Sequence, residues 1–212
     1  MKKTRDQITP IVNQDDVNQL FEADEIFIRI YALYGSPPDW ERPQGFITLS
    51  KIILEQQVSL QSANAHFNKL NGYLPKFTPE EILKLSDVEM RECQISKQKS
   101  KYLRALSVTI LDGKIDLSVL PALPIALVRE QLKSINGIGD WTTDIYLMFC
   151  LQAKDVFPLG DIAVINTIKE LTTAVTKPEI IEYAGKWKPY RSLVTFFLWH
   201  YYLSKRKRNS VL

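Results

Sequence analysis

A glycine-containing segment between two helix-like stretches carries the first chemical signal. Gly137-Ile138-Gly139 follows a helical pattern that ends near Ser134, and another helical pattern starts at Asp140. Glycine permits positive φ and lets another backbone come close. The N–H groups that open the second helix would point outward with the helix dipole behind them, which allows them to bind a phosphate without lysine or arginine. An ordinary tight turn between packed helices explains the same residues, so both interpretations stay open for this segment alone.

A second signal lies 22 positions after Gly139, where Phe157-Pro158-Leu159-Gly160 leads to Asp161 at the start of a helical stretch. The helix terminus would stabilise this carboxylate as the anion. Taken alone, such an aspartate is most simply an N-cap. The order of a phosphate-binding turn, a buried connecting helix and an aspartate on a proline-glycine loop favours a functional carboxylate.

Helices must position both features, because helical patterns fill nearly the whole chain. Apolar residues recur at helical spacing from Phe46 to Leu70, interrupted only at Gln56. Capping-box patterns predict three helix starts, at Thr78–Glu81, Ser86–Glu89 and Thr176–Glu179. Further helices are expected over 96–111, 124–134 and 140–151, and from about Pro189. Strand-like segments are few and lack hairpin turns, so we predict an all-α chain.

Composition bounds the class of protein. A chain of 212 residues, 45% hydrophobic and 24% charged, is long enough for one domain or for two small lobes that share a core. No apolar run approaches the roughly 20 residues that span a bilayer, and the basic N-terminus lacks the apolar stretch of a secretory signal. Two cysteines and two histidines cannot build a disulfide framework or a Cys/His zinc site (Cys93, Cys150, His66, His200).

The net charge of +3 comes from the chain ends. Three basic residues lie at the N-terminus, and Lys205-Arg206-Lys207-Arg208 lie near the C-terminus. Without these seven, 20 basic residues face 24 acidic ones, a net charge of −4. Bulk electrostatics therefore does not indicate a nucleic-acid binder, and phosphate contacts in the body must come from local geometry. The C-terminal basic run fits a phosphate-binding tail, a localisation signal or a solvated helix end.

The order of these motifs resembles the helix-hairpin-helix DNA glycosylase superfamily, within it most closely the 3-methyladenine DNA glycosylase II family. Three further stretches share the likeness: Ile53-Leu54-Glu55-Gln56-Gln57-Val58-Ser59, Gln152-Ala153-Lys154-Asp155-Val156-Phe157, and Trp187-Lys188-Pro189-Tyr190-Arg191-Ser192 with Trp199. The motifs reach from about Ile47 to Trp199.

The resemblance implies a role for each matching residue. Asp161 matches the catalytic aspartate, and Gln57 matches the wedge that fills the gap left by an extruded nucleotide. Gly137, Ile138 and Gly139 match the phosphate-binding hairpin. Trp141 and Trp199 match aromatic positions beside the base pocket, although core packing explains them too. The backbone carbonyls of Lys133, Ile135 and Ile138 match positions that can hold a monovalent cation, Na⁺ or K⁺.

Departures from the superfamily pattern refine these expectations. Lyase-competent relatives have a lysine where this chain has Trp141, so we expect a monofunctional enzyme that forms no Schiff base. The cysteine quartet of an iron–sulfur cluster is missing from the sequence, and no cofactor is expected. Gly160 stands where some members have a second acid, and Ile145 where some have tyrosine, which leaves the substrate range open.

The resemblance implies hydrolysis of the N-glycosidic bond of alkylated purines, of the 3-methyladenine and 7-methylguanine type, by base flipping in double-stranded DNA. The alternatives are a non-catalytic helix-hairpin-helix DNA-binding module and a glycosylase for mismatched or deaminated bases. We expect two helical lobes with an active-site cleft between them: 44–161, and 1–43 with 162–212. We also expect a monomer without membrane partners, inside the cell: cytoplasmic or nucleoid-associated in a bacterium, nuclear in a eukaryote.

Overall fold

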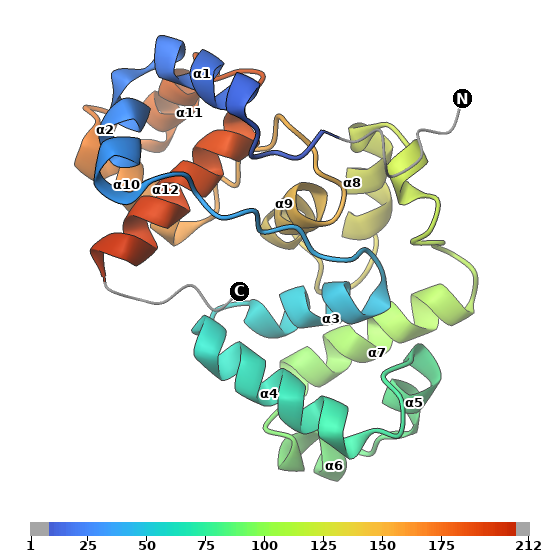
Figure 1. The fold of residues 1–212 in the computed structure, drawn as a ribbon. Helices are drawn as coiled ribbons and strands as arrows, with labels where there is room; N and C mark the ends of the chain where they lie inside the picture. Colours follow the sequence, from blue (N-terminus) through green and yellow to red (C-terminus); the bar gives the residue numbers. More distant parts are fainter. Residues whose placement is uncertain (1–8, 207–212) are drawn as a thin grey trace. The chain divides into compact units, whose positions relative to one another are not determined.

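The computed structural model describes residues 9–206, and all regular secondary structure within that range is helical (Figure 1). The prediction of an all-α chain is therefore confirmed. In chain order the helices are α1 (Gln14–Ala23), α2 (Glu25–Tyr34), α3 (Phe46–Glu55), α4 (Leu60–Tyr73), α5 (Pro79–Lys84), α6 (Asp87–Glu92), α7 (Lys97–Leu111), α8 (Ile125–Lys133), α9 (Asp140–Phe149), α10 (Ile162–Leu171), α11 (Lys177–Gly185) and α12 (Arg191–Lys205), with a short 3-10 helix at Leu120–Ala122.

The chain forms two compact units, and the division falls inside α9. The middle unit is Arg42–Tyr146. The terminal unit contains the two chain ends, Met1–Glu41 and Leu147–Leu212, of which the structure describes residues 9–41 and 147–206. Residues 147–161 thus group with the chain ends, whereas we expected them in the central lobe. Contacts with the N-terminal segment explain this, since the Ile11 N–H donates to Gln152 Oε1 at 3.0 Å and Lys154 pairs with Asp16 at 2.6 Å.

Helix α7 is the structural centre of the middle unit, where it packs against α3, α5 and α6. Ser96 caps its start, because the Ser96 hydroxyl accepts from the Lys99 N–H at 3.2 Å. Its buried residues recur at helical spacing (Ser100, Leu103, Leu106, Ser107), while three lysines lie in its first five residues. The helix predicted over 96–111 is confirmed.

Helix α12 has the same position in the terminal unit, where it packs against α1, α2 and α10. Seven consecutive residues of α12, Ser192 to Leu198, are buried. A helix buried on all sides belongs to the interior of a domain, because every face needs an apolar or hydrogen-bonded neighbour. Phe196 and Phe197 are completely buried, and the Phe197 ring meets Phe21 of α1 and Phe27 of α2.

The helical pattern from Phe46 to Leu70 divides into two helices. Helix α3 ends at Glu55, and α4 begins at Leu60 after a short turn. Gln57 adopts a left-handed backbone with φ 58°, and the Ser59 hydroxyl accepts from the Ser62 N–H at 3.2 Å as an N-cap. The apolar spacing is interrupted at Gln56, the C-cap of α3, and this interruption was the one sign of the turn in the pattern.

Two of the three predicted capping boxes are complete. Ser86 and Glu89 exchange side-chain and backbone bonds at the start of α6, and Thr176 and Glu179 do the same at α11. At α5 the Thr78 hydroxyl accepts from the Glu81 N–H at 3.4 Å, and Pro79 occupies the first turn.

A buried aspartate joins three helices of the terminal unit. Asp24 caps α2 and accepts from Trp187 Nε1 at 3.0 Å, while Lys186 Nζ lies 2.8 Å from its carboxylate. Burial raises the pKa of Asp24, but the hydrogen bonds from Lys186, Trp187 and the Ile26 N–H outweigh this, so the pKa is lowered. The Asp24 carboxylate therefore has a structural role in the terminal unit.

Part of the C-terminal basic run is held by the fold. Lys205 pairs with Glu170 of α10, and the Arg206 guanidinium lies 3.8 Å from the centre of the Tyr202 ring. Lys207 and Arg208 lie outside the described residues, as do Lys2, Lys3 and Arg5. Across residues 9–206, no helix combines the length and the apolar character needed to cross a membrane.

Candidate active site and DNA-binding hairpin

The predicted hairpin joins α8 to α9 through residues 134–139, and its buried apolar side chains fix it to the middle unit. Ile135 and Ile138 point into the core, whereas Asn136 and Gly139 are exposed. The Ile138 N–H donates to the Ile135 carbonyl at 3.0 Å, and the Gly139 carbonyl accepts the first helical bond of α9 from the Thr143 N–H at 3.0 Å. At Gly139, where there is no side chain, the hairpin therefore exposes its backbone directly. That is the arrangement required for a contact with a phosphate.

The two glycines of the hairpin serve different purposes. Gly137 has φ 94°, and a Cβ placed there would lie 2.1 Å from Tyr102 Cγ on α7. Only glycine fits, because the backbone conformation and the tyrosine ring both exclude a side chain. Gly139 lies outside the left-handed region, and a Cβ there would have no atom within 4 Å. Nothing within the middle unit requires a glycine at position 139, so any such requirement must come from a ligand.

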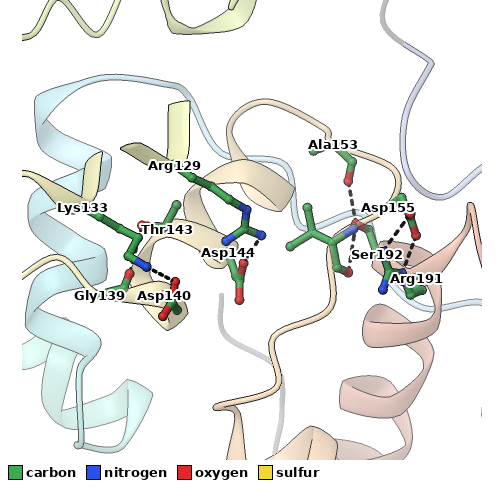
Figure 2. Close-up of polar contacts among 11 residues, drawn as sticks. Arg129, Lys133, Gly139, Asp140, Thr143, Asp144, Ala153, Asp155, Arg191 and Ser192 are labelled. Atoms are coloured by element: carbon green, nitrogen blue, oxygen red, sulfur yellow. Dashed lines mark hydrogen bonds and ion pairs between the residues drawn. The ribbon is translucent and has the colours of Figure 1, made fainter. Parts of the chain in front are cut away.

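Two ion pairs lie on α8 and α9 beside the hairpin (Figure 2). Lys133 Nζ lies 2.6 Å from the carboxylate of Asp140, an exposed residue whose pKa is lowered by this hydrogen bond. Arg129 pairs with Asp144, which is nearly completely buried. Burial raises the pKa of Asp144 to about 6, although the Arg129 guanidinium opposes the shift.

Gln57 and Trp141, the predicted wedge and pocket residue, also belong to the middle unit. Gln57 is exposed and lies two residues after the end of α3. Trp141 is half-buried in the first turn of α9. Gln56 directly precedes Gln57, and its side-chain amide nitrogen donates to the Gly137 carbonyl at 2.9 Å and to Thr142 Oγ1 at 2.8 Å. No sequence pattern predicted a role for Gln56.

The carbonyls predicted to hold a cation fit such an ion chemically. Lys133 is the last residue of α8, and helix ends leave carbonyl oxygens without intrahelical donors. The Ile135 carbonyl accepts one hydrogen bond, from Ile138, and a carbonyl oxygen has two lone pairs. Neutral oxygen ligands suit Na⁺ or K⁺ better than a transition metal. Within residues 9–206, no group of three His, Cys, Asp or Glu side chains is placed to bind a metal ion.

Asp161 lies in the terminal unit as the N-cap of α10. The preceding turn closes when the Asp161 N–H donates to the Pro158 carbonyl at 2.8 Å. Asp161 Oδ1 accepts from the Val164 N–H at 3.0 Å and from Trp199 Nε1 at 3.1 Å. The N-cap interpretation is thus correct, and it is compatible with function, because these two donors orient the carboxylate.

Trp199 connects this carboxylate to an aromatic cluster. Its ring stacks on Phe196 with centroids 6.0 Å apart and meets the edges of Trp40 and Phe149 at 5.8 and 5.7 Å. Trp199 itself stays half-buried, whereas the other three rings are almost completely buried. Its indole is therefore held firmly with its N–H directed at Asp161. No sequence pattern predicted Trp40 or Phe149 as a neighbour of Trp199.

The loop that leads to Asp161 is fixed to the other end of α12. Arg191 makes two hydrogen bonds to the Asp155 carboxylate, at 2.6 and 2.9 Å, and Ser192 Oγ bonds to the Ala153 carbonyl (Figure 2). The Val156 N–H donates to Ser192 Oγ at 3.0 Å. Because Trp199 lies two turns further along α12, one helix holds this loop near both ends.

The matching protein family is the HhH-GPD superfamily of base excision DNA repair proteins, whose sequence profile fits residues 50–189. The chain belongs to this superfamily. The match contains the hairpin, Gln57, Trp141 and Asp161, and it ends before Trp199.

Individual HhH-GPD relatives carry glycosylase names. YfjP of Bacillus subtilis, provisionally named a DNA-3-methyladenine glycosylase, is 32% identical over 162 residues, which are 71% of this chain and 56% of YfjP. DNA-3-methyladenine glycosylase 1 of Schizosaccharomyces pombe is 29% identical over 181 residues, 81% of this chain and 78% of that protein. The chain thus spans little more than half the length of YfjP.

A solved structure has a similar fold. The S. pombe 3-methyladenine DNA glycosylase Mag1, in complex with abasic DNA, superposes with a TM-score of 0.81 at 25% identity and covers 91% of this chain and 97% of its own. A DNA-3-methyladenine glycosidase of Bacillus halodurans gives 0.75 at 26% identity, with 92% of each chain covered.

The two hairpin glycines should respond differently to alanine. We expect Gly137→Ala to lower the free energy of unfolding by about 3 kcal/mol, because it combines overpacking against Tyr102 with backbone strain. Gly139→Ala should change stability by less than about 0.5 kcal/mol yet weaken binding to duplex DNA. Urea denaturation and fluorescence anisotropy measure the two effects. A Gly139→Ala protein that binds DNA like the parent would show that the exposed glycine is not a contact.

The raised pKa of Asp144 predicts a pH-dependent contribution to stability. The folded chain binds this proton below about pH 6, whereas the unfolded chain binds it only near pH 3.8. The stabilising contribution of Asp144 is therefore greatest below pH 3.8 and is lost as the pH rises through about 6. This difference between the folded and unfolded pKa of Asp144 corresponds to about 3 kcal/mol. The free energy of unfolding of the parent, relative to Asp144→Asn, should therefore fall by that amount between about pH 4 and about pH 7.

Asp140→Asn provides the matched control, since it makes the same chemical change on the same helix in an exposed residue. Its unfolding free energy should follow the parent closely through this interval, because Asp140 is only a minor cause of the raised pKa of Asp144. If the difference between Asp144→Asn and the parent does not change with pH, the pKa of Asp144 is the same in the folded and unfolded chains, and the ion pair with Arg129 compensates for burial.

Proposed function

We propose that this protein excises alkylated purines, of the 3-methyladenine and 7-methylguanine type, from double-stranded DNA by hydrolysis of the N-glycosidic bond. The observation that carries the proposal is the carboxylate of Asp161, fixed at the start of α10 by the Val164 N–H and the Trp199 indole. Membership of the HhH-GPD superfamily and the glycosylase names of similar proteins support the same activity. The likeness to the 3-methyladenine DNA glycosylase II family supports this substrate class.

An alkylated purine is a good leaving group, so its excision needs little catalytic assistance. Alkylation at N3 or N7 gives the purine a positive charge, so the C1′–N bond breaks to release a neutral base. Positive charge develops on the deoxyribose as this bond lengthens, and the Asp161 carboxylate stabilises it electrostatically. Water then adds to C1′ and loses a proton, which leaves an abasic site. A preorganised anion suits this reaction because no proton has to reach the leaving base.

The other residues hold the DNA and select the base. The backbone N–H groups at the hairpin bind a phosphate, Gln57 fills the space of the extruded nucleotide, and extrusion costs least for a damaged base. Trp141 and Trp199 favour an electron-poor purine through cation–π attraction. A monovalent cation on the carbonyls of Lys133, Ile135 and Ile138 would fix the hairpin backbone. The protein acts on DNA as a monomer, in the cytoplasm or nucleoid of a bacterium or in the nucleus of a eukaryote.

Asp161→Asn tests the role of the carboxylate. Asparagine is also a good N-cap, so α10 should keep its start, while release of 3-methyladenine from methylated DNA should fall at least about a hundredfold. DNA binding should persist, because the hairpin is unchanged. Chromatography of released bases under single-turnover conditions gives the rate. Asp15→Asn, an exposed change of the same kind in the terminal unit, is the control. Equal rates for Asp161→Asn and the parent would contradict the assignment and favour a protein that only binds DNA.

Trp141 predicts a monofunctional enzyme. An indole cannot form the Schiff base through which lyase-competent relatives cleave the strand. Borohydride reduction in the presence of abasic DNA should therefore trap no covalent adduct, whereas a lyase-competent glycosylase assayed in parallel should give one. An efficient adduct with this protein would show that another amine acts as a nucleophile.

A further inference from the structure

The C-terminal end of α3 is held by three contacts from different parts of the middle unit. Lys99 Nζ of α7 donates to the Leu54 carbonyl at 2.5 Å, and Arg42 pairs with Glu55 at 2.9 Å. The third contact is made by Gln56, which bonds to the hairpin. Helix ends commonly leave carbonyl groups to solvent, so this degree of fixation is more than α3 needs in order to terminate.

Gln56 uses both protons of its amide nitrogen on the hairpin. One goes to the Gly137 carbonyl at 2.9 Å and the other to Thr142 Oγ1 at 2.8 Å. The Gly137 carbonyl can only accept, so the nitrogen, and not the oxygen, of the Gln56 amide must face it. These partners lie on either side of residues 138–141, which include the exposed backbone at the start of α9. Gln56 thus connects to both ends of the proposed phosphate-binding segment.

Gln57 is the next residue, and its backbone is strained. Its φ of 58° lies in the left-handed region, which non-glycine residues occupy only when their surroundings impose it. On one side the chain is fixed by the contacts of Leu54, Glu55 and Gln56. On the other, Ser59 starts α4 as its N-cap. The exposed Gln57 side chain is therefore presented from a short, fixed turn.

We propose that Gln56 is a positioning residue that sets the place of Gln57 relative to the hairpin. This inference rests on the proposed function. A phosphate contact fixes the register of a protein on the duplex, and a side chain that fills an extruded nucleotide's place must then match that register. A displacement of such groups by about 1 Å can lower the reaction rate about a hundredfold. Gln56 links the two contacts within one unit of the fold.

The experiment compares Gln56→Ala with Gln61→Ala, an exposed glutamine on α4 of the same unit. Three quantities are measured with the full chain: the single-turnover rate of 3-methyladenine release, the affinity for undamaged duplex DNA by anisotropy, and base extrusion by the emission of 2-aminopurine at the target position. For Gln56→Ala we expect release and the extrusion signal to fall about tenfold, as the loss of two hydrogen bonds implies. Affinity for undamaged DNA should stay within about twofold, because Ile135 and Ile138 still anchor the hairpin.

Thr142→Val tests whether the effect passes through this contact. It removes one acceptor from a buried position while it keeps the side-chain shape. If Gln56 acts through the hairpin, the double variant should lose little more activity than Gln56→Ala alone. Additive losses would show that Gln56 acts elsewhere. Gln56→Met keeps the side-chain length without its amide and should reproduce the loss if Gln56→Ala does not fold.

The outcomes separate the two proposals. A parent protein that releases no base overturns the proposed function itself. An active parent with equal rates for Gln56→Ala and Gln61→Ala overturns only the role of Gln56. A Gln56→Ala protein whose affinity for undamaged DNA falls as much as its release rate also overturns that role, because Gln56 would then merely support the hairpin.

Discussion

The bond from the Trp199 indole to Asp161 is the contact on which the arrangement of the terminal unit depends. It needs α12 to lie against the start of α10, and the consecutive buried residues of α12 and the cluster of Trp40, Phe149 and Phe196 around the indole secure that packing. Arg191 and Ser192 then fix the loop before Asp161 to the same helix. The Val164 N–H and the Trp199 indole together orient the Asp161 carboxylate.

Helix α7 has the corresponding task in the middle unit. Its Tyr102 ring lies against Gly137, and its Lys99 holds the last turn of α3. One helix thus supports both the hairpin and the turn that presents Gln57. In the proposed function, a hairpin anchored by Ile135 and Ile138 would bind a phosphate through backbone groups, which suits a body of net negative charge. A broad basic surface is unnecessary when N–H groups and a helix dipole supply the attraction.

Each unit therefore prepares part of the proposed reaction. The middle unit contains the hairpin, Gln57 and Trp141, and the terminal unit contains Asp161 and Trp199. Within each unit, part-buried hydrogen bonds restrict the groups proposed to act before any DNA is bound. Preorganisation of this kind lowers the cost of reaching the transition state, because the groups need not be ordered during the reaction.

Local patterns in the sequence predicted the helical class, most helix starts, the hairpin and the loop that ends at Asp161. Those features depend on local physics: apolar spacing, capping side chains, and the conformational freedom of glycine, which act over a few residues. The contacts of each feature depend instead on how the helices pack. Three contacts join residues that are 35 to 86 positions apart: the Tyr102 ring on Gly137, the Gln56 amide on the hairpin and α9, and the indole on Asp161. The turn at Gln56–Ser59 divides one helical pattern into two helices. No local signal encodes such partners, because packing between helices selects them only after the helices have formed.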